Sequence, residues 1–264
     1  LILPIYFGKA GLYPVEVLAW IGAVIILAYL FHPERILHVC RVKLSKKSLY
    51  LTIRNVGYMC RLGFSSFLCE TAIATMMFVG NYVFIRYLGE DGVAAYSIAC
   101  YFFPIVFMVY NAIAQSAQPI LSYNYGAKCT ARVRETFRLA LTTAILCGAG
   151  VFLLTWIFSH QIVGMFLDSS YPAYNIAVKG LPLFASGFVF FGINIVSIGY
   201  FQSLERDCLA MIITLLRGFV LILLCFWILP IIWGSWGIWL AVPMSELLTF
   251  LFVLVIYWLE NRRN

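Results

Sequence analysis

Residues 209–230, with the sequence LAMIITLLRGFVLILLCFWILP, form an apolar run that contains one charged side chain, Arg217. About 20 apolar residues in a helix cross the hydrocarbon core of a bilayer. A segment in lipid must also satisfy its own backbone hydrogen bonds, which a lone strand cannot do. The run therefore predicts a transmembrane α-helix.

Six further runs of similar character fill most of the remaining chain. They lie at residues 12–31, 56–88, 93–121, 139–158, 173–201 and 237–259. The 264 residues are 63% hydrophobic and only 11% charged, whereas soluble proteins have about 25% charged residues. We therefore expect an all-α, polytopic membrane helix bundle with seven transmembrane helices. The short polar segment 89–92, Gly-Glu-Asp-Gly, is the predicted turn between the second and third spans.

Basic residues are distributed unevenly between the two ends of these spans. Thirteen of the 18 Lys and Arg residues fall after the first, third and fifth spans or on the C-terminal tail, and three fall on the opposite side. Loops rich in Lys and Arg stay in the cytoplasm. The pattern predicts a multi-pass protein of the cell (inner) membrane whose N-terminus is outside and whose C-terminus is cytoplasmic. This placement accounts for the net charge of +7 without a nucleic-acid partner.

Cysteine and histidine usage does not indicate a disulfide framework or a metal site. None of the eight cysteines forms a CxxC pair or falls in a predicted outer loop, and the three histidines lack metal-ligand spacing. No nucleophile motif is present, so an enzyme is not expected. The chain starts Leu1-Ile2-Leu3-Pro4 without a basic leader, and we expect it to be a piece of a longer polypeptide.

The second span contains a carboxylate at a depth where charges are costly. Glu70 lies well inside the apolar run, beside Thr71, with Asn81 three turns further on the same face. A desolvated carboxylate there can take up a proton near neutral pH, or hold a sodium ion with hydroxyl and amide oxygens. The alternative is a structural hydrogen bond to a neighbouring helix.

Arg217 in the sixth span and Glu246 in the seventh lie at comparable depths, each about 15 Å from a helix end. An unpaired charge at that depth is hard to sustain. We therefore expect the two side chains to pair across adjacent helices in a structural role.

The third span ends in a polar stretch that carries Asn111, Gln115, Gln118 and Pro119. Gln115 and Gln118 are one turn apart, so they share a face. The small residues Ala112, Ala114 and Ala117 beside them allow close helix approach. The pattern fits either a helix that lines a wet cavity or an interface sealed by amide hydrogen bonds.

Prolines inside the spans are candidate kinks, because a proline removes one helical hydrogen bond. They are Pro104, Pro119, Pro182 and Pro243.

Three motifs resemble the multidrug and toxic compound extrusion (MATE) family. Residues 114–127, AQSAQPILSYNYGA, resemble the family's Gln-Pro…Asn-Tyr-Gly-Ala signature; Leu215-Leu216-Arg217 with Pro230 resembles its eleventh helix; and residues 237–246, GIWLAVPMSE, resemble its twelfth. The resemblance implies two six-helix lobes. Residues 1–31 would then end the N-terminal lobe, 32–54 would be the cytoplasmic interlobe linker, and 55–264 would form the C-terminal transport lobe.

The resemblance further implies a cation-coupled antiporter that exports small organic, cationic compounds, with H⁺ or Na⁺ as the coupling ion and no other cofactor. Its partners would be membrane lipids and the missing N-terminal lobe. Glu70 matches an acidic position of the seventh helix. The span that matches the tenth helix has no acid, and Asn194 and Gln202 are the amides considered there; Asn194 is included among the binding candidates.

Two alternatives remain open. A lipid-linked oligosaccharide flippase of related architecture would need cationic residues along its cavity, whereas the Lys and Arg residues here cluster at loops. A seven-span receptor would share the helix count and the outer N-terminus, but there is no outer cysteine pair and no sizeable outer domain.

Overall fold

The computed structural model describes Ile21, Val24 and residues 46–263. The chain divides into two compact units, Leu1–Gly57 and Tyr58–Asn264, and the second contains the features analysed below. The predicted first span and most of the predicted linker lie outside the described residues. Helix α4 begins at Lys46, so residues 46–54, which the sequence analysis assigned to the linker, are helical.

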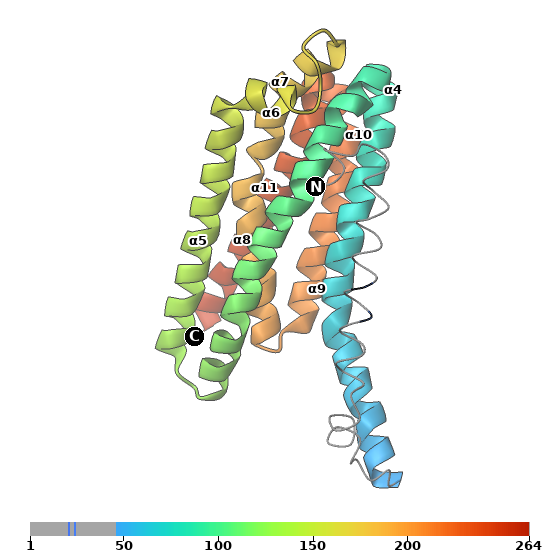
Figure 1. Cartoon of the computed structure of the whole chain (residues 1–264). Helices are drawn as coiled ribbons and strands as arrows, with labels where there is room; N and C mark the ends of the chain where they lie inside the picture. Colours follow the sequence, from blue (N-terminus) through green and yellow to red (C-terminus); the bar gives the residue numbers. More distant parts are fainter. Residues whose placement is uncertain (1–20, 22–23, 25–45, 264) are drawn as a thin grey trace. The chain divides into compact units, whose positions relative to one another are not determined.

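Helices make up nearly all of residues 46–263, and no strand occurs among them, which confirms the all-α class. Apolar side chains on long uninterrupted runs favour this outcome, because a helix satisfies its own backbone. The elements, labelled in Figure 1, are α4 (Lys46–Gly126), α5 (Thr130–Ile157), α6 (Ser159–Gly164), α7 (Pro172–Ala185), α8 (Phe188–Ser203), α9 (Asp207–Leu215), the π-helical turn η2 (Leu216–Leu221), α10 (Ile222–Trp233) and α11 (Ser235–Arg263).

Helix α4 is a hairpin rather than one rod. Gly89 has φ 66° and ψ −158°, a backbone region that is open essentially to glycine alone. The chain reverses there, and the two arms diverge away from the turn (Figure 1). Near the turn the rings of Phe84 and Tyr96 stack at 4.3 Å, and the Tyr96 hydroxyl donates to the carbonyl of Met76 at 3.3 Å. The turn predicted at residues 89–92 is therefore confirmed.

Four helices in the described residues are long and apolar enough to cross a membrane, or five when the bent pair α7 and α8 counts as one span. One of the four, Ser66–Gly126, contains the Gly89 reversal, so each of its arms is a separate rod. The total of seven spans stays a prediction, since the first lies outside the described residues.

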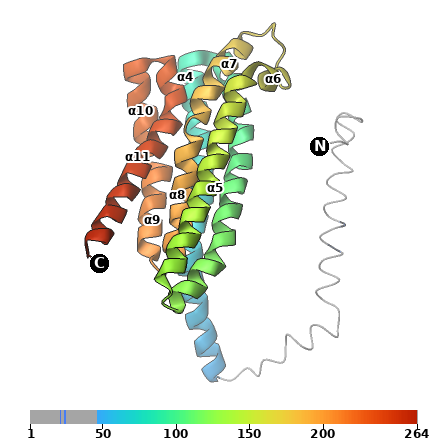
Figure 2. The same ribbon diagram turned by 90° about the vertical axis from the view of Figure 1, so that its left-hand side faces the viewer.

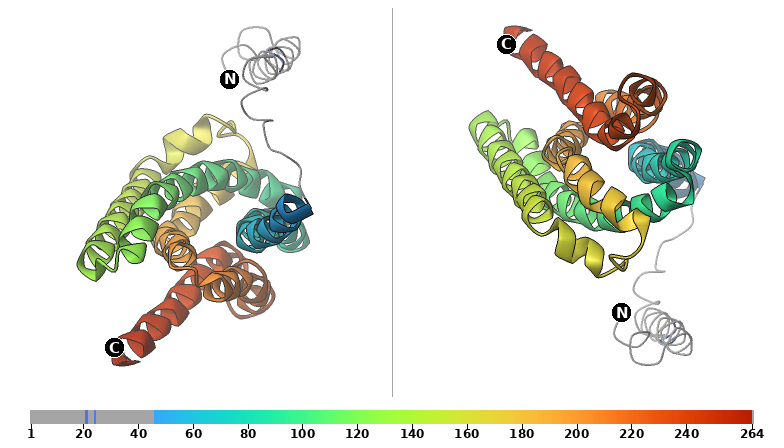
Figure 3. Two further views of the ribbon diagram at one scale, coloured as in Figure 1. Left: turned by 90° about the horizontal axis from the view of Figure 1, so that it is seen from below. Right: turned by 90° about the horizontal axis from the view of Figure 1, so that it is seen from above.

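Behind the hairpin, α5 lies against α8, α8 against α11, and α11 against α10 (Figures 2 and 3). The run expected as a single span at 173–201 is broken: α7 and α8 meet at a 41° bend. The bend falls one turn after Pro182, where the Ser186 hydroxyl donates to the Leu183 carbonyl at 2.6 Å. By contrast, the helices continue through Pro104, Pro119 and Pro243.

Aromatic side chains fill the bundle next to the hairpin turn. Trp239 of α11 is buried with its ring edge-on to Phe84 at 4.9 Å and to Phe184 of α7 at 6.5 Å. The Trp239 ring also lies directly over the α-carbon of Gly180, where a β-carbon would overlap it. Glycine at position 180 allows this close approach of the Trp239 ring, because a β-carbon would overlap three of its ring atoms.

We predict that Gly180→Ala lowers the free energy of unfolding by about 1–3 kcal/mol, because the added methyl overlaps the Trp239 ring and forces it to move. Gly150→Ala on α5 is the matched control, since nothing lies within 4 Å of its β-position. Thermal unfolding of the full-length protein in detergent measures both. Equal stability of the two variants would contradict this account of the aromatic core.

Candidate functional site

A cavity of about 190 Å³ opens where the two arms of α4 diverge and α8 closes the space between them. Its polar members are contributed by all three helices: Glu70 by the first arm, Asn111, Gln115 and Gln118 by the second, and Gln202 by α8. Ser66, Cys69, Phe107, Ala114, Ile195, Ile198 and Gly199 complete the lining. The structure therefore has a cavity at the position where the third span was expected to line one.

Helical spacing explains how the second arm contributes three amides to one wall. Asn111, Gln115 and Gln118 are separated by four and three residues, which places them on one face. Gln118 Nε2 donates to Gln202 Oε1 at 3.0 Å, and this bond ties the second arm to α8. The small residues Ala114 and Gly199 lie between these amides and let the two helices approach closely.

Glu70 reaches the cavity wall, but it is exposed in this chain. The expectation of a desolvated carboxylate stays a prediction, since nothing in the described residues tests it. The two arms diverge at this level and leave the cavity open beside Glu70. An exposed carboxylate is free to meet a ligand or an ion.

Thr71 and Asn81 do not line this cavity. The Thr71 hydroxyl donates to the Phe67 carbonyl at 2.9 Å, and the Asn81 amide donates to the Met77 carbonyl at 3.0 Å. Both side chains thus bond to the backbone of their own helix, one turn earlier. Their assignment as binding residues stays a prediction without a contact to support it.

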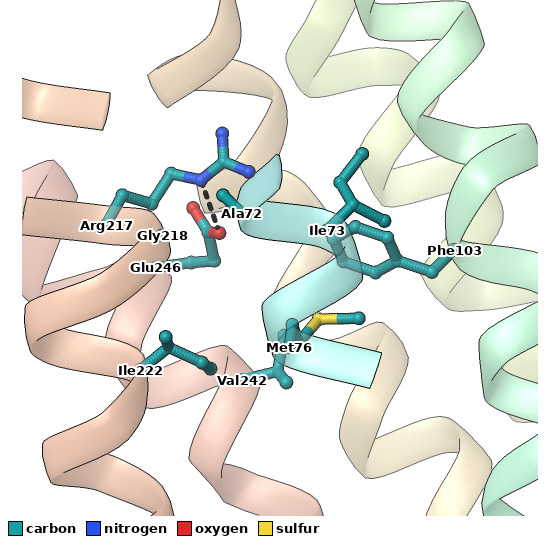
Figure 4. A pocket seen from close by; sticks show the side chains of 9 residues that line it. All are labelled: Ala72, Ile73, Met76, Phe103, Arg217, Gly218, Ile222, Val242 and Glu246. Atoms are coloured by element: carbon teal, nitrogen blue, oxygen red, sulfur yellow. Dashed lines mark ion pairs between the residues drawn. The ribbon is translucent and has the colours of Figure 1, made fainter. Parts of the chain in front are cut away.

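A second polar centre is buried between helices, away from the cavity. Arg217 Nε lies 3.0 Å from Glu246 Oε1, and both side chains are about 5% exposed or less. Asn194 of α8 is fully buried, and its amide donates to Glu246 Oε2 at 2.8 Å and to the Glu246 carbonyl at 2.9 Å. The pairing anticipated between Arg217 and Glu246 is thus present (Figure 4). The structure places Asn194 with this pair rather than with Glu70.

The surroundings of the ion pair are tight and largely apolar. The Arg217 guanidinium lies 4.7 Å from the centre of the Phe191 ring, a favourable cation–π arrangement. Arg217 Nη1 and Asn194 Oδ1 have no hydrogen-bond partner within the described part of the chain. A space of about 10 Å³ beside the pair, bordered by Ala72 and Met76 (Figure 4), is close to the room that one water needs.

The local backbone at Arg217 was not foreseeable from the sequence. Residues 216–221 form a π-helical turn inside an otherwise α-helical run, and such turns are common at functional positions. No Gly-Pro pair or polar cluster marks it. Gln202 was a missed cavity residue, although its amide at the end of an apolar run was a usable signal.

Removing either partner of the buried pair should be more damaging than removing both. Arg217→Met or Glu246→Met alone leaves an uncompensated charge and should lower stability by about 3–5 kcal/mol, whereas the double variant should lose far less than the sum. A double-mutant cycle on thermal unfolding of the full-length protein tests this. Strictly additive losses would show that the two side chains are not coupled.

A family model described as MatE matches residues 66–227. The probable multidrug resistance protein NorM of Rhizobium meliloti (strain 1021) is 26% identical over 161 residues, which are 58% of this chain and 34% of that protein.

Solved structures show the same fold. A variant of the Vibrio cholerae MATE transporter VcmN superposes with a TM-score of 0.78 at 16% identity, covering 100% of this chain and 58% of that one. A MOP superfamily transporter from Pyrococcus furiosus gives 0.77 at 17% identity, covering 96% and 56%. The chain thus spans little more than half of these structures, and about a third of the NorM relative.

Proposed function

This chain belongs to the MatE family, and we propose that it forms the C-terminal lobe, with one preceding helix, of an exporter of drug-like organic compounds driven by H⁺ or Na⁺. The observation that carries the proposal is the cavity between the arms of α4 and α8, in which the Glu70 carboxylate faces amides from two other helices.

The size of this cavity supports a half-site. Sites that enclose drug-sized ligands measure about 300–1,000 Å³, and this one measures about 190 Å³. A second wall is needed to enclose such a ligand. An N-terminal lobe facing the open side of the α4 hairpin would supply it, in the way that repeats of a transporter enclose a midplane site.

The lining chemistry supports a cationic cargo. Among the side chains that the structure describes, Glu70 is the one carboxylate that borders the cavity, and no Lys or Arg borders it. A carboxylate with carbonyl-type amide oxygens nearby attracts an organic cation, a proton or a hard cation such as Na⁺. The same lining disfavours a flippase for a pyrophosphate-linked lipid, which requires positive charge in the cavity.

Coupling follows from competition for one carboxylate. A proton or Na⁺ on Glu70 neutralises the charge that holds an organic cation, so ion entry and cargo release are linked by differential affinity. Glu246 cannot perform this role in the described conformation, because Arg217 and Asn194 occupy its oxygens. Any further coupling acid would have to belong to the other lobe.

We predict that Glu70→Gln in the full-length protein, reconstituted in vesicles, reduces ion-driven efflux of an organic cation at least tenfold while leaving the protein folded. The amide keeps the shape of the side chain but loses its charge. Glu90→Gln is the matched control, since Glu90 is exposed beside the hairpin turn and outside the cavity. Unchanged coupled efflux by the Glu70 variant would remove this residue from the mechanism.

A further inference from the structure

We propose that a second cavity, next to the hairpin turn of α4, binds the phosphodiester headgroup of an anionic phospholipid. The cavity measures about 250 Å³ and lies between the end of the first α4 arm, α7 and the start of α11. It is lined by Leu88, Asn175, Ile176, Lys179, Gly180, Leu183, Ser235, Trp236 and Trp239. This site goes beyond the proposed export function and does not depend on it.

Exposed aromatic residues indicate the level at which this cavity would lie in a bilayer. Trp236 is 55% exposed at its rim, and Trp233, 50% exposed, lies one turn earlier in the chain. Tyr87 and Tyr171 are also exposed at this end of the bundle. Exposed Trp and Tyr side chains concentrate at the headgroup level of membranes. The cavity is thus positioned where lipid phosphates lie.

The charge of the lining selects an anion. Lys179 contributes an exposed ammonium with three donor hydrogens, and no carboxylate borders the cavity. Among the described side chains, no carboxylate forms an ion pair with Lys179. The first turn of the 29-residue helix α11 begins at Ser235, so its unsatisfied N–H groups and positive dipole end add to the attraction.

The size of the cavity and its apolar lining favour a lipid headgroup inside the cavity, with the acyl chains of the lipid outside it. The volume is below that of sites which enclose a whole drug-sized molecule. Trp239 forms an apolar floor, and Leu88 and Leu183 form walls. The preceding helix α10 also has exposed apolar side chains that would face the hydrocarbon of a bilayer. They are Leu224, Trp227, Ile228, Ile231 and Ile232.

Binding should be measured on the full-length transporter purified in a nonionic detergent. Native mass spectrometry and thermal unfolding would follow titration with phosphatidylglycerol, phosphatidylcholine or inorganic phosphate. We expect retention of phosphatidylglycerol and a rise in melting temperature, since a ligand of the folded state stabilises it. Phosphatidylcholine and inorganic phosphate should each give a smaller effect.

Lys179→Gln should weaken phosphatidylglycerol binding about fivefold, the equivalent of one Lys–headgroup attraction, and Lys179→Arg should restore it. Arg86→Gln is the matched control, because Arg86 is an exposed cation on the first arm of α4, near Leu88, and does not line the cavity. Normal binding by Lys179→Gln, or an equal loss in the Arg86 variant, would overturn the site. Equal binding of phosphatidylcholine, or an equal effect of inorganic phosphate, would overturn its lipid specificity.

Discussion

The stacking of Phe84 on Tyr96 holds the two arms of α4 together beside Gly89, and the positions of both cavities follow from it. Because the arms are joined only at this end, they separate with distance from the turn. Trp239 and Phe184 fill the narrow part with rings. The wide part is left to the polar cavity, closed on one side by α8. The hairpin is thus filled with rings near the turn and hollow further from it.

The two carboxylates within the predicted spans, Glu246 and Glu70, differ in how far they are removed from solvent. Glu246 is removed from solvent, where a charge without a partner would cost several kcal/mol; Arg217 and Asn194 supply that partner. Glu70 lies in the open part of the hairpin, where it is exposed among the described residues. A paired carboxylate stabilises the packing of α8, η2 and α11, whereas an open one is available to ions and cargo.

Sequence patterns were informative for features that depend on one helix alone, such as a turn or a shared face. The polar segment 89–92 predicted the turn of α4, and the spacing of Asn111, Gln115 and Gln118 predicted a shared face. Patterns were less informative where the rotation of one helix relative to another determines which side chains meet. Asn194 was grouped with Glu70, yet α8 turns it toward α11, and Thr71 bonds to its own helix. The π-helical turn at Arg217 has no local sequence signal.

The first arm of α4 connects the two cavities mechanically. Leu88 borders the cavity near the turn, and Glu70 borders the polar cavity. Eighteen residues of uninterrupted helix separate them, which corresponds to about 27 Å. Phe84 lies four residues from Leu88 and fourteen from Glu70 on this arm, so any rigid tilt about the Phe84–Tyr96 contact would displace Glu70 more than Leu88. The carboxylate in one cavity and the ammonium in the other have opposite charge, so a cation and a lipid phosphate do not compete for the same group. They would act on the same arm from opposite sides of the Phe84–Tyr96 contact.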